Sequence, residues 1–258
     1  MLNKKCIVLI PARMESSRLD GKPMKKIAGI PMIIHVAIRS SQCSIADRTI
    51  VCTDSADIIY ECEKYGIEAC NTRHDHRNGT ERIAEAAMLL GLPDDQIVVD
   101  VQGDEPFVNP IYISKVANYV AKSKYVCVVP YQDFEEPNNT NRVKIVNSSD
   151  KVIYFSRADV PNYFGKTNQS MKKHLSIVGF RVNALKKYQS ISSTELENIE
   201  KIELFRLIEN NINIGTFKMD GESMSVDTEE DYQKACRMIE TDKQFLKLLH
   251  EGFFNVKS

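Results

Sequence analysis

Three basic side chains follow the first apolar run of the sequence. Residues 6–10, "CIVLI", are typical of a buried strand, and the polar loop behind them carries Arg13, Arg18 and Lys22. Such side chains, with loop N–H groups, bind polyphosphates and stabilise charge that develops on them. The loop is neither GxxxxGK[ST] nor GxGxxG. A solvated surface loop is the alternative, but three cations so close behind a buried strand favour an anion site.

Acidic side chains occupy two places where they could serve that anion. Asp104 and Glu105 belong to "QGDEP", directly behind the apolar run "IVVDV". Mg²⁺ takes one or two carboxylates together with phosphate oxygens, so Asp104 beside a triphosphate would suit it. The alternative is an ordinary helix-entry turn, where acids are also favoured. Asp227 precedes the predicted helix cap Thr228 and is either a second metal ligand or a neighbour of that cap.

Histidines mark two further polar segments. His74 and His76 lie in "TRHDHRNGTER", residues 72–82, but no cysteine stands at zinc-site spacing from them. A role for this loop in contacting a base or a phosphate is therefore favoured over zinc binding. His174 begins a predicted strand just after a basic loop.

Valine- and isoleucine-rich runs alternate with amphipathic segments in the first half of the chain. This pattern predicts an α/β fold with a mostly parallel sheet covered by helices. The predicted strands are 5–10, 48–53, 66–70, 96–102 and 125–130, and the predicted helices are 31–41, 55–66, 79–91 and 110–123. Ligands bind outside the carboxyl ends of such strands, so the three polar clusters should converge.

The pattern changes after about residue 132. Three strand-like runs with little helix between them, "RVKIVN", "KVIYFSR" and "KHLSIVGFRV", predict a smaller antiparallel excursion. Helices are predicted again at 194–210 and 228–240, and loops at 133–141 and 162–173. We expect one domain over 1–258, with 132–190 as a β-rich subregion.

Composition excludes some classes of protein. With 34 basic and 35 acidic residues, the net charge of −1 argues against a general nucleic-acid or membrane-surface binder. The seven cysteines include no CxxC pair and are expected to be buried free thiols in a reducing cytoplasm. No apolar run approaches the ~20 residues that span a bilayer.

The sequence resembles the 3-deoxy-manno-octulosonate cytidylyltransferases, or CMP-KDO synthetases, from residue 10 to about 232. The matching stretches are "IPARMESSRLDGKPM", "TRHDHRNGTER", "VQGDEP", "VKIV", "YFSRADVP", "KHLSIVGFR", "LENIEKIELFR" and "VDTEEDY". The resemblance implies a nucleotide-diphospho-sugar transferase fold and a homodimer. It also implies that CTP and an eight-carbon 2-keto-3-deoxy sugar acid give CMP-sugar and pyrophosphate, for lipopolysaccharide biosynthesis.

The resemblance also implies roles for individual residues. The expected CTP side consists of Arg13, Arg18, Lys22, Arg73, Thr80 and Gln102, with Lys22, Asp104 and Arg13 nearest the chemistry. The expected Mg²⁺ ligands are Asp104 and Asp227. The expected sugar side consists of Gln102, Arg157, His174, Glu203 and Arg206, with His174 and an arginine pairing with the carboxylate.

The chain departs from the family pattern mainly on the sugar side. Asp20 stands where the family has proline and Asn78 where it has serine. Ser176, Val178, Phe180 and Leu204 replace a glycine, two tyrosines and a glutamine. The sequence therefore predicts cytidylyl transfer but leaves open KDO, 8-amino-KDO or another modified acid. A nine-carbon sialic-type acid, or a silent nucleotide-binding homologue, are the alternatives.

Overall fold

Strand β1 (Cys6–Pro11) lies at the centre of the sheet, and its side chains alternate between two hydrophobic clusters. Cys6, Val8 and Ile10 pack into one cluster, Ile7 and Leu9 into the other, and none is more than 5% exposed. Successive side chains of a strand point to opposite faces of the sheet. Because both sets are buried here, helices must cover both faces. The computed structural model describes residues 5–15, 19–164, 170–221, 224–242 and 245.

One ten-stranded sheet runs through these residues in the order β10-β8-β9-β12-β7-β11-β6-β1-β4-β5. β9, β10 and β11 are antiparallel to the other seven strands. Besides β1, its strands are β4 (Ala46–Thr53), β5 (Glu68–Asn71), β6 (Ile97–Val101), β7 (Cys127–Phe134), β8 (Lys144–Ser148), β9 (Lys151–Ser156), β10 (Met171–His174), β11 (Ile177–Arg181) and β12 (Ile214–Lys218). A small hairpin, β2 (Lys26–Ile27) with β3 (Ile30–Pro31), stands beside it.

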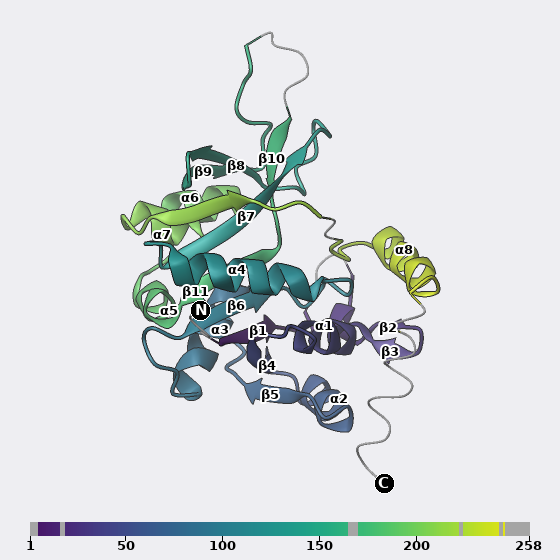
Figure 1. Ribbon diagram of the computed structural model, residues 1–258. Coiled ribbons are helices and arrows are strands. Elements are labelled where there is room, and N and C mark those ends of the chain that lie inside the picture. Colours follow the sequence, from purple (N-terminus) through teal and green to yellow (C-terminus); the bar gives the residue numbers. More distant parts are fainter. Residues whose placement is uncertain (1–4, 16–18, 165–169, 222–223, 243–244, 246–258) are drawn as a thin grey trace.

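Helices cover both faces of the sheet. The first cluster holds the apolar sides of α1 (Met32–Ser41), α2 (Ala56–Lys64), α4 (Pro110–Lys122) and α8 (Glu229–Ile239). The second cluster holds those of α3 (Gly79–Leu89), α5 (Val182–Ser190), α6 (Glu195–Glu200) and α7 (Phe205–Glu209). Figure 1 shows α4 lying along one face of the sheet and α8 standing apart beside β2 and β3. The predicted α/β class is confirmed.

The second half of the chain differs in detail from the prediction. β8, β9 and β10 join the main sheet, and because β10 also pairs with β7, the pairings β7-β10-β8-β9-β12 close on themselves. The run 173–182 is two strands separated at Leu175 and Ser176, and the helix expected over 194–210 is broken at Lys201, whose φ is 54°. α5 and β12 were not predicted, and β10 occupies part of the loop predicted over 162–173.

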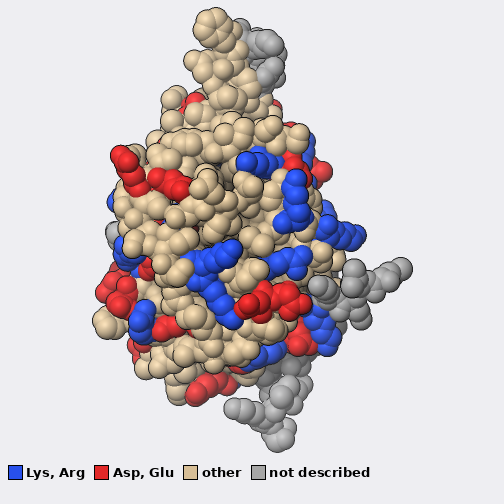
Figure 2. All heavy atoms as spheres, turned by 90° about the vertical axis from the view of Figure 1, so that its left-hand side faces the viewer, with Lys and Arg blue, Asp and Glu red and all other residues tan. Residues whose placement is uncertain are grey.

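The surface carries charges of both signs. Figure 2 shows basic and acidic side chains interspersed over the face that it displays. Among the described residues, the helices are all too short or too polar to cross a membrane. The cysteines are free thiols, and all but Cys236 are buried.

His35 on α1 should make stability depend on pH. It is fully buried with Nε2 2.8 Å from the carbonyl oxygen of Ile27, and burial lowers its pKa to about 4. The unfolded chain, with an ordinary pKa near 6.5, binds the proton first as pH falls. As pH falls from about 6.5 to about 4, we expect His35 to lower the free energy of unfolding by about 1.4 kcal/mol per pH unit. His35→Gln should flatten the pH dependence of urea unfolding, whereas replacing the exposed His74 should leave it unchanged.

Candidate active site

The ammonium of Lys22 joins two carboxylates from distant parts of the chain. Lys22 lies in a short 3₁₀ helix after β1, Asp104 in the loop after β6, and Asp227 just before α8. Lys22 Nζ is 2.6 Å from Asp104 Oδ2 and 3.1 Å from Asp227 Oδ1. Burial opposes the charge on Lys22, but the two aspartates raise its pKa overall. Lysine therefore stays charged at this edge of the sheet.

A cavity of about 270 Å³ opens around this trio, and we call it the polar cavity. Its lining includes Arg13, Lys22, Gly79, Gln102, Asp104 and Asp227. Asn78 also lines it and caps α3, because its side-chain oxygen accepts a hydrogen bond from Glu81 N at 2.8 Å. The polar cavity therefore combines loop cations, two carboxylates and the N-terminus of a helix, which together suit a polyphosphate and a divalent cation.

A larger cavity of about 440 Å³ adjoins the polar cavity and shares Asn78 and Gln102 with it. Arg157, His174 and Glu203 line this large cavity, as do Ser176, Val178 and Leu204. Phe180, by contrast, is fully buried in the core. Three of the four sugar-side departures therefore face the large cavity, and the fourth does not.

A third cavity of about 170 Å³, the bridging cavity, touches both of the others. It shares Asp104 and Asp227 with the polar cavity, and His174 and Ser176 with the large cavity. Gln102 lines all three. The amide of Gln102 therefore stands where the three spaces meet.

A buried acid orients that amide. Gln102 Nε2 donates to Asp100 Oδ2 at 2.9 Å, and Asp100 is fully buried on β6. Burial, with Glu203 and Asp104 nearby, raises the pKa of Asp100 well above its usual value. Burial also raises the pKa of Glu203, against the hydrogen bond that Thr80 donates to it. Nothing in the sequence singles out Asp100, because it is one polar residue within an apolar strand.

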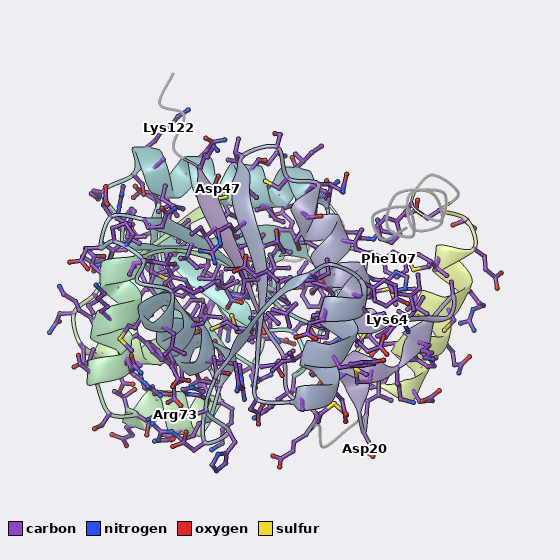
Figure 3. The ribbon with its side chains drawn as sticks, turned by 90° about the horizontal axis from the view of Figure 1, so that it is seen from below. Asp20, Asp47, Lys64, Arg73, Phe107 and Lys122 are labelled. Atoms are coloured by element: carbon purple, nitrogen blue, oxygen red, sulfur yellow. The ribbon has the colours of Figure 1, made fainter. Side chains whose placement is uncertain are left out.

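Two predicted residues, Arg73 and Thr80, line neither the polar cavity nor the large cavity. Arg73 is exposed, pairs with Asp75 and Glu85, and lies well apart from Asp20 of the opening loop in Figure 3. Thr80 is fully buried, and its hydroxyl donates to Glu203. Arg18 lies outside the described residues.

Arg206 and Arg157 are occupied by other protein groups. Arg206 is 1% exposed, bonded to Glu81 and Glu197, and stacked on Tyr188. Arg206 lines neither the polar cavity nor the large cavity, because its guanidinium is held in this internal network, and its expected contact with the sugar acid stays a prediction. Arg157 does line the large cavity, but its guanidinium donates to the carbonyl oxygens of residues 140, 200 and 201.

Gly103 allows the loop after β6 to lie against β1. A Cβ there would lie 2.8 Å from the carbonyl oxygen of Pro11 and 3.2 Å from Ile33 Cδ1. We expect Gly103→Ala to displace Asp104 from Lys22 and to lower kcat by roughly tenfold to a hundredfold. Gly91→Ala, with a strained φ of 62° but open space around it, should lower stability and leave kcat unchanged. An unaltered rate in Gly103→Ala would contradict this account.

Known proteins resemble this chain over most of its length. The profile of the cytidylyltransferase family matches residues 7–214. A 3-deoxy-manno-octulosonate cytidylyltransferase from Nitratiruptor sp. is 37% identical over 235 residues, 88% of this chain and 97% of that protein. One from Haemophilus influenzae is 37% identical over 251 residues, 91% and 98% of the two chains. A solved CMP:2-keto-3-deoxy-manno-octonic acid synthetase complexed with CTP is 30% identical, covers 92% of this chain and 99% of its own, and has a TM-score of 0.86. The chain belongs to the 3-deoxy-manno-octulosonate cytidylyltransferase family.

Proposed function

We propose that the chain transfers the cytidylyl group of CTP to KDO or a modified KDO, an eight-carbon 2-keto-3-deoxy sugar acid, and releases pyrophosphate. The observation that carries this proposal is the Lys22–Asp104–Asp227 trio, which lies in a polar cavity that opens onto a second, larger one. The CTP-bound relative and the names of the homologues support the choice of both substrates. They do not favour a nine-carbon acid or a silent homologue.

The residues that line the polar cavity and the large cavity can be assigned to the steps of cytidylyl transfer. CTP phosphates would lie among Arg13, Lys22 and the N-terminus of α3, with the sugar in the large cavity. The anomeric hydroxyl then attacks the α-phosphorus in line, and Lys22 offsets charge on the phosphate oxygens as pyrophosphate departs. A covalent intermediate on the protein is not required by this chemistry.

Mg²⁺ is the metal that the donor set fits. Asp104 and Asp227 supply two carboxylates, and among the described residues no group of three or more metal-ligating side chains gathers, as a structural zinc site would need. Two carboxylates completed by phosphate oxygens are characteristic of Mg²⁺. When bound there, Mg²⁺ would neutralise phosphate charge and lower the pKa of the attacking hydroxyl.

A pyrophosphate-release assay tests the proposal. Wild-type protein with CTP and Mg²⁺ is given KDO, 8-amino-KDO or a nonulosonate in turn. We expect release with an octulosonate, at a kcat/KM above that for the nonulosonate. No release with any of these acids would refute the proposed function, even if CTP raised the melting temperature.

We further propose a cytoplasmic homodimer that contacts through residues 132–190 and serves lipopolysaccharide synthesis. Two large apolar side chains in this region are exposed, Ile153 on β9 by 51% and Phe164 by 95%. The dimer expected from the family resemblance would bury them if its contact lies here. Light scattering of wild type and of Ile153→Lys should distinguish a dimer from a monomer.

A further inference from the structure

Lys173 on β10 is a buried lysine whose charge is not matched. The residue is 7% exposed, and among the described residues its ammonium forms neither a hydrogen bond nor an ion pair. Burial lowers its pKa, and Arg142 lowers it further, against smaller opposite effects of Glu105 and Glu136. Burial of an ammonium without a close partner disfavours its charged form. Such a side chain is better explained by a ligand than by folding.

Lys173 lines the bridging cavity, and a second cation lies with it. Arg142, half-buried in the turn before β8, lines the same cavity. Its guanidinium also forms no hydrogen bond or ion pair with the described residues, although its charge lowers the pKa of Asp231. Glu105, whose charge raises the pKa of Lys173, accepts a hydrogen bond from the hydroxyl of Ser225 at 2.5 Å. Two cations therefore face a 170 Å³ space large enough for a small anionic group.

We propose that Lys173 and Arg142 bind the carboxylate of the sugar acid in the bridging cavity. This inference rests on the proposed function. In a 2-keto-3-deoxy acid the carboxylate is bonded to the same carbon as the attacking anomeric hydroxyl, so it must lie beside the reacting phosphate. The bridging cavity meets that requirement, because it touches Asp104 and Asp227 and also opens to the large cavity. The large cavity then remains for the polyhydroxyl part of the sugar.

The arginines expected to bind the carboxylate are less suited to it. All the nitrogens of Arg157 donate to backbone carbonyl oxygens, and Arg206 is held by two glutamates. Either would have to break existing hydrogen bonds to bind a carboxylate. Lys173 and Arg142 would gain partners without losing any, so binding there gains more free energy.

Steady-state kinetics of Lys173→Met and Arg142→Met test this assignment. Each variant should raise the KM for the sugar acid by roughly tenfold to a hundredfold, the size of a charged hydrogen bond. The KM for CTP should not change. Lys172→Met is the matched control, because the neighbouring Lys172 donates to Asn147 at 2.7 Å, stacks on Tyr131 and lines none of the three cavities. Its KM values should equal those of wild type.

A second substrate separates a carboxylate contact from a general defect. Wild type should use the carboxamide of the sugar acid much less well than the acid, and Lys173→Met should lose most of that discrimination. Melting temperature checks folding, and Lys173→Met should melt no lower than wild type because it removes an unmatched buried charge.

Three results would overturn the inference: unchanged KM in both variants, a rise confined to the KM for CTP, or discrimination kept in Lys173→Met. The first would make Lys173 structural, and the second would assign the cavity to phosphate. Each of these results is measured beside a wild-type enzyme that is active. If the proposed function were wrong, wild type itself would release no pyrophosphate, so the two failures are distinguishable.

Discussion

Lys22→Met is expected to lower kcat by roughly 10²–10³-fold, the range seen when one preorganised charge is removed from a transition state. Lys22 lies within 3.1 Å of both carboxylates and inside the polar cavity, so its loss removes the cation closest to the expected α-phosphate. The KM for the sugar acid should change far less than kcat. Initial rates of pyrophosphate release at saturating CTP and sugar measure the effect.

Metal dependence gives a second readout for the same variant. Without Lys22, Asp104 and Asp227 are left as neighbouring negative charges, so Mg²⁺ alone should raise the melting temperature of Lys22→Met more than that of wild type. Lys25→Met is the matched control, because Lys25 pairs with the exposed Glu229 at 3.1 Å outside the cavity. If Lys22→Met kept a wild-type kcat, the assignment of Lys22 to the chemistry would be wrong.

Arg206→Met is expected to destabilise the protein by about 3–5 kcal/mol, because it leaves the buried Glu197 without its cation and Glu81 with Arg77 alone. The side chain of Arg206 is 2% exposed, and its Nη2 lies 2.9 Å from Glu81 Oε1 and 2.5 Å from Glu197 Oε1. For a chain of this size the melting temperature should fall by roughly 6–20 °C. Urea unfolding, monitored by circular dichroism, measures the loss.

The control for this variant is an exposed pair. Arg48 bonds to Glu68 on the surface, and Arg48→Met should change stability by less than about 1 kcal/mol. If Arg206→Met kept its stability and raised the KM for the sugar acid instead, Arg206 would contact the substrate, as the sequence resemblance implies.

The site could be predicted where chemistry and strand ends coincide. Lys22 and Asp104 were expected to lie together because each lies in a loop that follows a recognisable strand, whereas the place of Asp227 beside them was implied by the family resemblance. The helices 31–41, 55–66 and 110–123 were placed to within a few residues, the first from Pro31 at its start and the second from its Ser55 cap and Gly66 stop.

What could not be predicted depends on pairing between distant segments. The ring of strands β7-β10-β8-β9-β12 follows from antiparallel partners whose register leaves no local signal. The break at Ser176 turns one apolar run into β10 and β11, and thereby moves Lys173 and His174 to the edge of the site. The internal ion pairs of Arg206 could not be predicted either, because Glu81, one of its partners, lies 125 residues away in the sequence.

The C-terminal segment closes on the N-terminal loop, which affects how the enzyme is made. Lys22 bonds to Asp227, and Tyr232 donates to the carbonyl oxygen of Lys26 at 2.7 Å across 206 residues. Arg39 bonds to Asp242 at 2.7 Å. A chain emerging from the ribosome could thus form the central strands β1, β4 and β6 early. The contacts of Lys22 with Asp227 and of Lys26 with Tyr232 would form only after those C-terminal residues had left the exit tunnel, so the proposed pair of Mg²⁺ ligands would be completed last.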